Sequence, residues 1–157
     1  MNAVTQITKP PVSAIRTAQR EFSDTSLAVI PLAKMSLSTL MSQPNRSELR
    51  DQADRVILAN TPATDAEVGK VIFSLLIMYE SFDRRGEHSK AMVVDQWRKS
   101  LTGWPVDILE VAAQSWINGE KASFTPQPGD IVTVCERIGA FRRAMAKKAV
   151  DFMEATA

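Results

Sequence analysis

The chain has 157 residues, 45% of them hydrophobic, and its 19 basic residues nearly balance its 18 acidic ones. A chain of this length and apolar content is expected to form one folded domain, which excludes a fully disordered protein. The balance of charge excludes a strongly basic nucleic-acid-binding domain, so any contact with nucleic acid would have to be local.

The first 45 residues differ from the rest of the chain. Ser, Thr and Pro are frequent, and although a short helix over 13–22 would fit, no apolar periodicity lasts beyond about two turns. We therefore expect a flexible N-terminal arm over residues 1–45, followed by a helical domain over residues 46–157. Apolar residues of the arm could dock on a partner or on the domain itself. The candidate anchors are Leu27, Val29, Ile30 and Leu32.

From Arg46 onward the apolar residues recur at helical spacing. Helices are predicted over five ranges: 46–59, 64–81, 90–101, 105–118 and 128–152. Thr64 and Glu67 have the spacing of a capping box at the start of the second helix. Gly103 stands where a left-handed residue would end the third helix. No segment alternates like a strand, so we predict an all-α fold, a compact bundle of about five helices with the flexible arm.

The sequence favours a protein of the reducing cytosol. Cys135 is the only cysteine, which excludes an intrachain disulfide, and no signal peptide is visible at the start. The longest apolar run, 71–79, is far shorter than the roughly 20 residues that cross a bilayer. We therefore expect a soluble protein without a membrane anchor.

Residue types that carry catalysis are sparse. His88 is the only histidine and stands in a polar, arginine-flanked loop, while Cys135 lies on the apolar face of the last helix, where cysteine behaves as a small hydrophobe. One cysteine and one histidine exclude the usual zinc sites within one chain. Two acidic pairs lie on polar helix faces and are interpreted as solvated surface: Asp51 with Asp54, and Asp107 with Glu110. We expect no enzyme and no cofactor or metal.

The last helix carries a local group of basic residues: Arg137, Arg142, Arg143, Lys147 and Lys148. They could form an ordinary solvated face, or they could contact nucleic acid or an acidic partner. Such contacts would position phosphates without reading bases. Phe141, the aromatic residue nearest to them, is expected to face the core.

Three tryptophans belong to the same half of the chain. Trp97 and Trp116 fall on apolar stripes of their helices and are predicted to be core residues. Trp104 stands in the turn between two helices, where we expect it to hold the turn together; a half-exposed contact residue is the alternative.

One short stretch, 123–131, interrupts the helices with the sequence SFTPQPGDI, and we call it the elbow. A tryptophan-containing helix and an alanine-rich helix precede it, and an apolar helix with Cys-Glu-Arg follows. Phe124 is expected to plug the core, and Pro128 with Gly129 to start the last helix.

The elbow and its flanks resemble the helical domain of phage replicative helicase loaders, the group that includes the lambda-type replication protein P and the loaders of some Bacillus phages. The resemblance covers roughly residues 66–140. The positions that carry it are Trp97, Leu101, Ala112, Ala113, Phe124, Pro126, Pro128, Gly129, Ile131 and Cys135. None of them is catalytic in kind.

The resemblance implies a phage or prophage DNA-replication adaptor in the cytoplasm of the bacterial host. Such a protein binds a DnaB-type replicative helicase and helps to load it, with no catalysis of its own. Two alternatives stay open from the residues alone: a small DNA-binding regulatory protein that uses the basic last helix, and a phage structural or assembly protein. The sequence leaves the oligomeric state open, and also whether the elbow contacts a partner.

Overall fold

The computed structural model describes residues 9–157, and the side chains of all of these except 24 and 25. Its helices are α1 (Val12–Glu21), α2 (Asp24–Leu27), α3 (Pro31–Lys34), α4 (Leu37–Met41), α5 (Arg46–Ala59), α6 (Asp65–Leu76), α7 (Glu80–Asp83), α8 (Glu87–Leu101), α9 (Val106–Ile117) and α10 (Pro128–Ala155). No strand occurs in these residues, which confirms the all-α prediction. No helix of the described chain has the length and hydropathy needed to cross a membrane.

The predicted number of helices was too low. The five predicted ranges correspond to α5, α6, α8, α9 and α10, and α1 lies where a short helix would fit. The four additional helices have only four or five residues each. Helices of about one turn show no apolar periodicity and depend on packing for their stability, so the sequence pattern does not reveal them.

Two predicted helix ends that rest on capping are confirmed. The Thr64 hydroxyl accepts a bond from the Glu67 backbone N–H at 3.2 Å, and the Glu67 carboxylate accepts one from the Thr64 N–H at 2.8 Å. Gly103 has a φ of +95°, a conformation that favours glycine. Helix α6, however, ends at Leu76 instead of near Ser81, because the chain turns there into α7.

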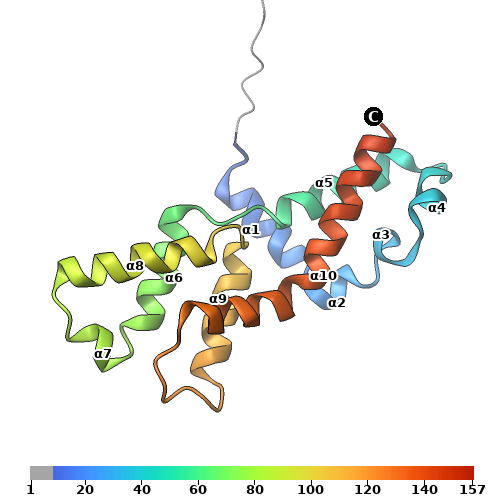
Figure 1. Ribbon diagram of the computed structural model, residues 1–157. Helices are drawn as coiled ribbons and strands as arrows, with labels where there is room; N and C mark the ends of the chain where they lie inside the picture. Colours follow the sequence, from blue (N-terminus) through green and yellow to red (C-terminus); the bar gives the residue numbers. More distant parts are fainter. Residues whose placement is uncertain (1–8) are drawn as a thin grey trace, which may run out of the picture.

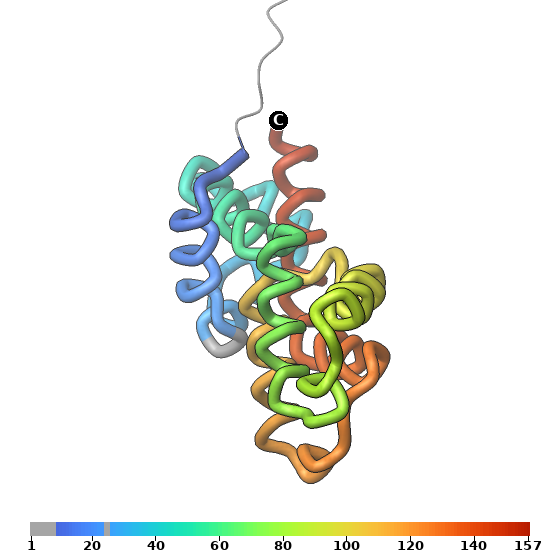
Figure 2. The backbone as a smooth tube through the Cα atoms, turned by 90° about the vertical axis from the view of Figure 1, so that its left-hand side faces the viewer, coloured from blue at the N-terminus to red at the C-terminus, as the bar shows by residue number. Residues whose placement is uncertain are grey.

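Buried side chains form two hydrophobic clusters. The elbow cluster consists of apolar residues of α6–α9, the α8–α9 turn and the start of α10. The N-terminal cluster consists of residues of α1–α5, with Phe22 after α1, and the end of α10. Figures 1 and 2 show α10 extending from one group of helices to the other, with a change of direction part-way along.

The N-terminal segment packs on the rest of the protein. Of the four proposed anchors, Leu27 and Leu32 are buried in the N-terminal cluster with exposures of 0% and 2%. They are therefore core residues and present no surface to a partner. This is the second of the two expected alternatives, in which the N-terminal segment docks on the domain itself. Ile30 is half-buried and Val29 is exposed. Residues 1–8 of the expected arm lie outside the described residues.

Candidate partner-binding site at the elbow

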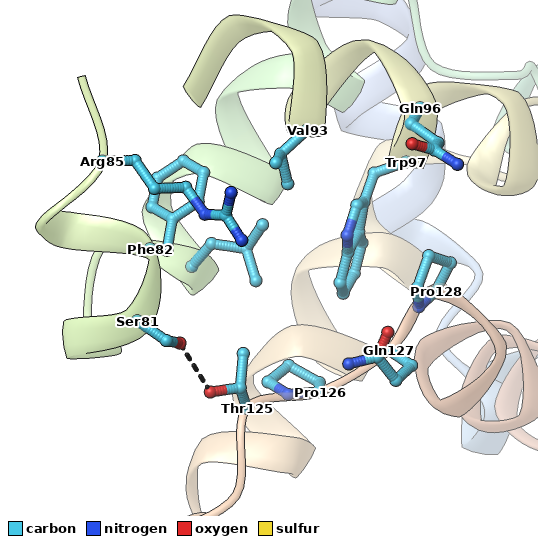
Figure 3. A pocket seen from close by; sticks show the side chains of 11 residues that line it. Ser81, Phe82, Arg85, Val93, Gln96, Trp97, Thr125, Pro126, Gln127 and Pro128 are labelled. Carbon is cyan, nitrogen blue, oxygen red and sulfur yellow. Dashed lines mark hydrogen bonds between the residues drawn. The ribbon is translucent and has the colours of Figure 1, made fainter. Parts of the chain in front are cut away.

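Hydrogen bonds from the side chains of three residues, Tyr79, Ser81 and Trp116, hold the connection between α9 and α10 in place. The Tyr79 hydroxyl donates to the Ala122 carbonyl at 3.0 Å, and the Trp116 indole N–H donates to the Phe124 carbonyl at 3.2 Å. The hydroxyls of Ser81 and Thr125 are 3.0 Å apart (Figure 3). These bonds fix the loop before any partner arrives, which lowers the entropy lost on binding.

Within the elbow, the structure contradicts the expected role of Phe124. Phe124, expected to plug the core, is 68% exposed, and Pro126 is fully buried in its place. Proline has no backbone N–H, so burying it leaves no donor without a partner. The carbonyl of Phe124 meets the Trp116 indole, and its ring is left at the surface.

The start of α10 agrees with the sequence. Pro128 is the first helical residue and Gly129 the second, as expected. The Asp130 carboxylate accepts a hydrogen bond from the backbone N–H of Gln127 at 2.7 Å. An acidic group at this end also faces the positive end of the helix dipole. The elbow therefore passes directly into a well-capped helix.

A pocket of about 270 Å³ lies between the elbow, α7 with the residues that follow it, and the face of α8 that carries Val93, Gln96 and Trp97. Its lining residues are Leu76, Ser81, Phe82, Arg85, Val93, Gln96, Trp97, Thr125, Pro126, Gln127 and Pro128. Figure 3 shows the Arg85 side chain extending across Phe82 toward the middle of this space, with Trp97 on the opposite side and Gln127 below. We call it the elbow pocket.

Arg85 is the one charged residue among the described residues that line the elbow pocket. None of the ion pairs formed within residues 9–157 includes it. Its guanidinium makes one long hydrogen bond, 3.3 Å to the Ser89 hydroxyl. The pocket therefore carries a positive charge that no carboxylate of the described chain neutralises.

The tryptophans have different roles. Trp97 is 5% exposed, as predicted for a core residue, and also forms a wall of the elbow pocket. Trp104 is also 5% exposed, and its carbonyl accepts from the Ala63 N–H at 2.9 Å, which confirms a structural role in the turn. Trp116 is half-buried and packs against the elbow cluster, while its indole N–H donates to the loop.

Two of the five basic residues of the last helix are used inside the protein. Arg142 is 4% exposed; its Nη1 lies 2.8 and 2.7 Å from the two Asp107 oxygens, and its Nη2 donates to the Phe22 carbonyl at 3.3 Å. The Lys148 ammonium donates to the Met35 carbonyl at 2.5 Å. The prediction is therefore wrong for Arg142, which is buried, while Lys148 is half-buried with its ammonium bonded to a backbone carbonyl.

The remaining basic residues do not form a continuous patch. The Arg143 guanidinium lies 3.6 Å from the centroid of the Trp104 ring, and Lys147 pairs with Asp151 at 2.9 Å. Arg137 is exposed, but at about 100° per residue it lies about 120° around the helix from Arg143 and about 80° from Lys147. Phe141, expected to face the core, is 39% exposed.

The acidic pair on α9 joins elements together, although Glu110 stays 48% exposed, as expected of solvated surface, and Asp107, at 23%, is half-buried. Asp107 holds Arg142, and the Glu110 carboxylate receives two bonds from Arg16 of α1, at 2.9 and 2.8 Å. The hydrogen bond from Arg16 lowers the pKa of Glu110 below its ordinary value of 4.5. These carboxylates dock α1 and α10 on α9.

The residues considered for nucleophilic or metal chemistry are separate from one another. Cys135 is fully buried, and burial raises the pKa of its thiol to about 12. His88 is exposed in the first turn of α8. In the described part of the chain, no group of three or more His, Cys, Asp or Glu side chains could hold a metal ion.

Comparison with known proteins gives no relative: no family model, no curated protein and no solved structure matches the chain.

Proposed function

We propose that the chain is a non-catalytic adaptor of DNA replication that binds a hexameric DnaB-type helicase and helps to load it onto DNA. The single observation that carries the proposal is the exposure of Phe124, 68%, on a loop held by hydrogen bonds from Tyr79 and Trp116. The resemblance of residues 66–140 to helicase loaders supplies the identity of the partner.

An exposed aromatic ring on an immobilised loop is suited to protein binding. Large aromatic side chains contribute much of the energy at protein interfaces, mostly where they enter a desolvated pocket of the partner. Because the loop is already ordered by Tyr79, Trp116 and the burial of Pro126, little conformational entropy remains to be lost. The elbow thus supports a role in binding another protein.

Helicase loading itself demands no active site. An adaptor shifts the helicase ring between closed and open states when it binds one state more tightly than the other.

Size-exclusion chromatography with light scattering tests the proposal. The full chain is mixed with the replicative helicase of its bacterial host, with and without ATP, and we expect a stable complex. The variant Phe124→Ala should weaken it about 30-fold, equivalent to a loss of about 2 kcal/mol at an interface hot spot. Phe141→Ala is the matched control. It also removes an exposed ring, but from a position more than three turns after the start of α10.

Each result has a definite meaning. Absence of a complex at micromolar concentrations would refute helicase binding. A complex that Phe124→Ala and Phe141→Ala leave equally intact would show that the elbow is not the contact. A DNA-binding role for the last helix receives less support, because Arg142 and Lys148 are bound within the protein.

A further inference from the structure

We infer that the elbow pocket binds a carboxylate lying next to an apolar side chain, and that an acidic-apolar segment of the partner protein supplies it. The inference rests on the proposed adaptor function and adds the chemistry by which the partner is recognised.

The charge of the elbow pocket selects an anion. Arg85 is the one charged residue among its described lining residues, and its guanidinium points into the space in Figure 3. The only side-chain hydrogen bond that it donates within the described chain, to Ser89, is long at 3.3 Å. A guanidinium presents donors in a planar fork that fits the two oxygens of a carboxylate.

The walls of the pocket select an apolar group beside that anion. Val93 and Pro128 are half-buried and leave apolar surface open in the pocket, whereas Phe82, Trp97 and Pro126 are 5% exposed or less and add only a small area. Removing apolar surface of a ligand from water against such walls is favourable. A partner that offers charge alone would leave these walls in contact with water.

The size of the pocket fits one side chain. A volume of about 270 Å³ exceeds the roughly 150 Å³ of a cavity that accepts benzene. It falls just below the range of roughly 300–1,000 Å³ typical of small-molecule sites. One apolar side chain with an adjoining carboxylate, presented on a protein segment, is the occupant of matching size.

The polar groups around Arg85 favour a carboxylate over a phosphate. Gln96 and Gln127 are neutral amides, which can donate or accept, and the hydroxyls of Ser81 and Thr125 are already paired with each other. A single cation with neutral neighbours matches one negative charge, whereas a phosphate group usually carries nearly two.

An NMR titration with N-acetyl-leucine tests the inference, since this probe joins a carboxylate to an apolar side chain. We expect shifts of the Trp97 indole N–H and of the side-chain amides of Gln96 and Gln127, with a Kd of about 2 mM, as usual for a ligand of this size. N-acetyl-leucinamide, which lacks the charge, should bind about tenfold more weakly.

Two arginine variants provide the control within the protein. Arg85→Gln should weaken the binding of N-acetyl-leucine about tenfold. Arg84→Gln removes the same charge one residue earlier, from a side chain that lies outside the pocket and pairs with Glu80, and should leave binding unchanged. Equal effects of the two variants, or equal binding of the acid and the amide, would overturn the inference. Stronger shifts of the same signals by inorganic phosphate would overturn the choice of a carboxylate.

The same variants separate this inference from the adaptor function. If the wild-type chain binds N-acetyl-leucine in the pocket but forms no complex with helicase, the helicase proposal fails while the pocket chemistry stands. If Arg85→Gln loses the probe but binds helicase as tightly as wild type, the adaptor function stands and the role of the pocket in it is refuted. A parallel loss of both supports the inference.

Discussion

Replacing Arg142 by methionine tests the most deeply buried charge of the described chain. This side chain is 4% exposed and connects three parts of the molecule: α10, Asp107 on α9, and the Phe22 carbonyl after α1. Methionine retains much of the length of the arginine stem, so the change removes the charge and its hydrogen bonds while leaving little empty space.

The expected cost is about 3 kcal/mol in the free energy of unfolding. Removing one partner of a buried ion pair costs about 3–5 kcal/mol, because the other charge is left without compensation. Asp107 is 23% exposed, so water can partly solvate its carboxylate, and the cost falls at the lower end. The bond to Phe22 adds little, since 3.3 Å is long for an N–H···O bond.

Urea unfolding followed by tryptophan fluorescence measures this cost, and a thermal scan should show a Tm lower by about 6–12 °C. The double variant Arg142→Met with Asp107→Leu should regain most of the loss, because no unpaired charge remains. Arg143→Met is the control on the same helix, where an exposed cation–π contact is worth about 0.5–1 kcal/mol. If Arg142→Met lowers the free energy of unfolding by no more than Arg143→Met does, the buried ion pair does not stabilise the fold.

Three further outcomes follow from single contacts. Gly139→Ala should destabilise by about 1 kcal/mol in urea unfolding, because a Cβ would lie 2.8 Å from Cζ3 of Trp104, whereas Gly129→Ala, with open space, should be neutral or stabilising. The Cys135 thiol, with a pKa of about 12, should resist a thiol reagent in the folded protein and react once it is unfolded in guanidinium chloride; prompt native reaction would contradict its burial. Because the pKa of Glu110 is lowered in the folded protein, its contribution to stability is present above its ordinary pKa of 4.5 and is lost as the pH falls through the pKa of the folded state. The difference in Tm between wild type and Glu110→Gln should therefore shrink in acid.

Long periodic helices and capping residues could be predicted from the sequence, whereas the packing of the N-terminal segment could not. The range 46–59 coincides with α5, and the capping box and Gly103 mark ends that need particular residues. Leu27 and Leu32 offered no comparable signal, because one-turn helices are stabilised by contacts with distant residues of α5 and α10.

The site was predictable only in part, for two physical reasons. The elbow was singled out by its prolines, but which of Phe124 and Pro126 enters the core depends on how the loop packs, including the bond from the Trp116 indole to the Phe124 carbonyl. Arg142 could have been recognised as buried, since it continues the spacing of Ile131, Cys135, Ala146 and Ala149 along one helix face. Arg85 gave no such signal, because pockets form from residues distant in sequence.

Helix α10 also has a consequence for cooperativity. Its 28 residues span about 42 Å of helix path, with Ile131 and Cys135 in the elbow cluster and Ala149 and Phe152 in the N-terminal cluster. Because α10 contributes side chains to both clusters, unfolding of one cluster removes packing from the other. We therefore expect both clusters to unfold in a single transition. A partner that binds the elbow should accordingly slow amide hydrogen exchange in α5, which packs in the other cluster. If the exchange rate in α5 is the same with and without the partner, the two clusters unfold independently.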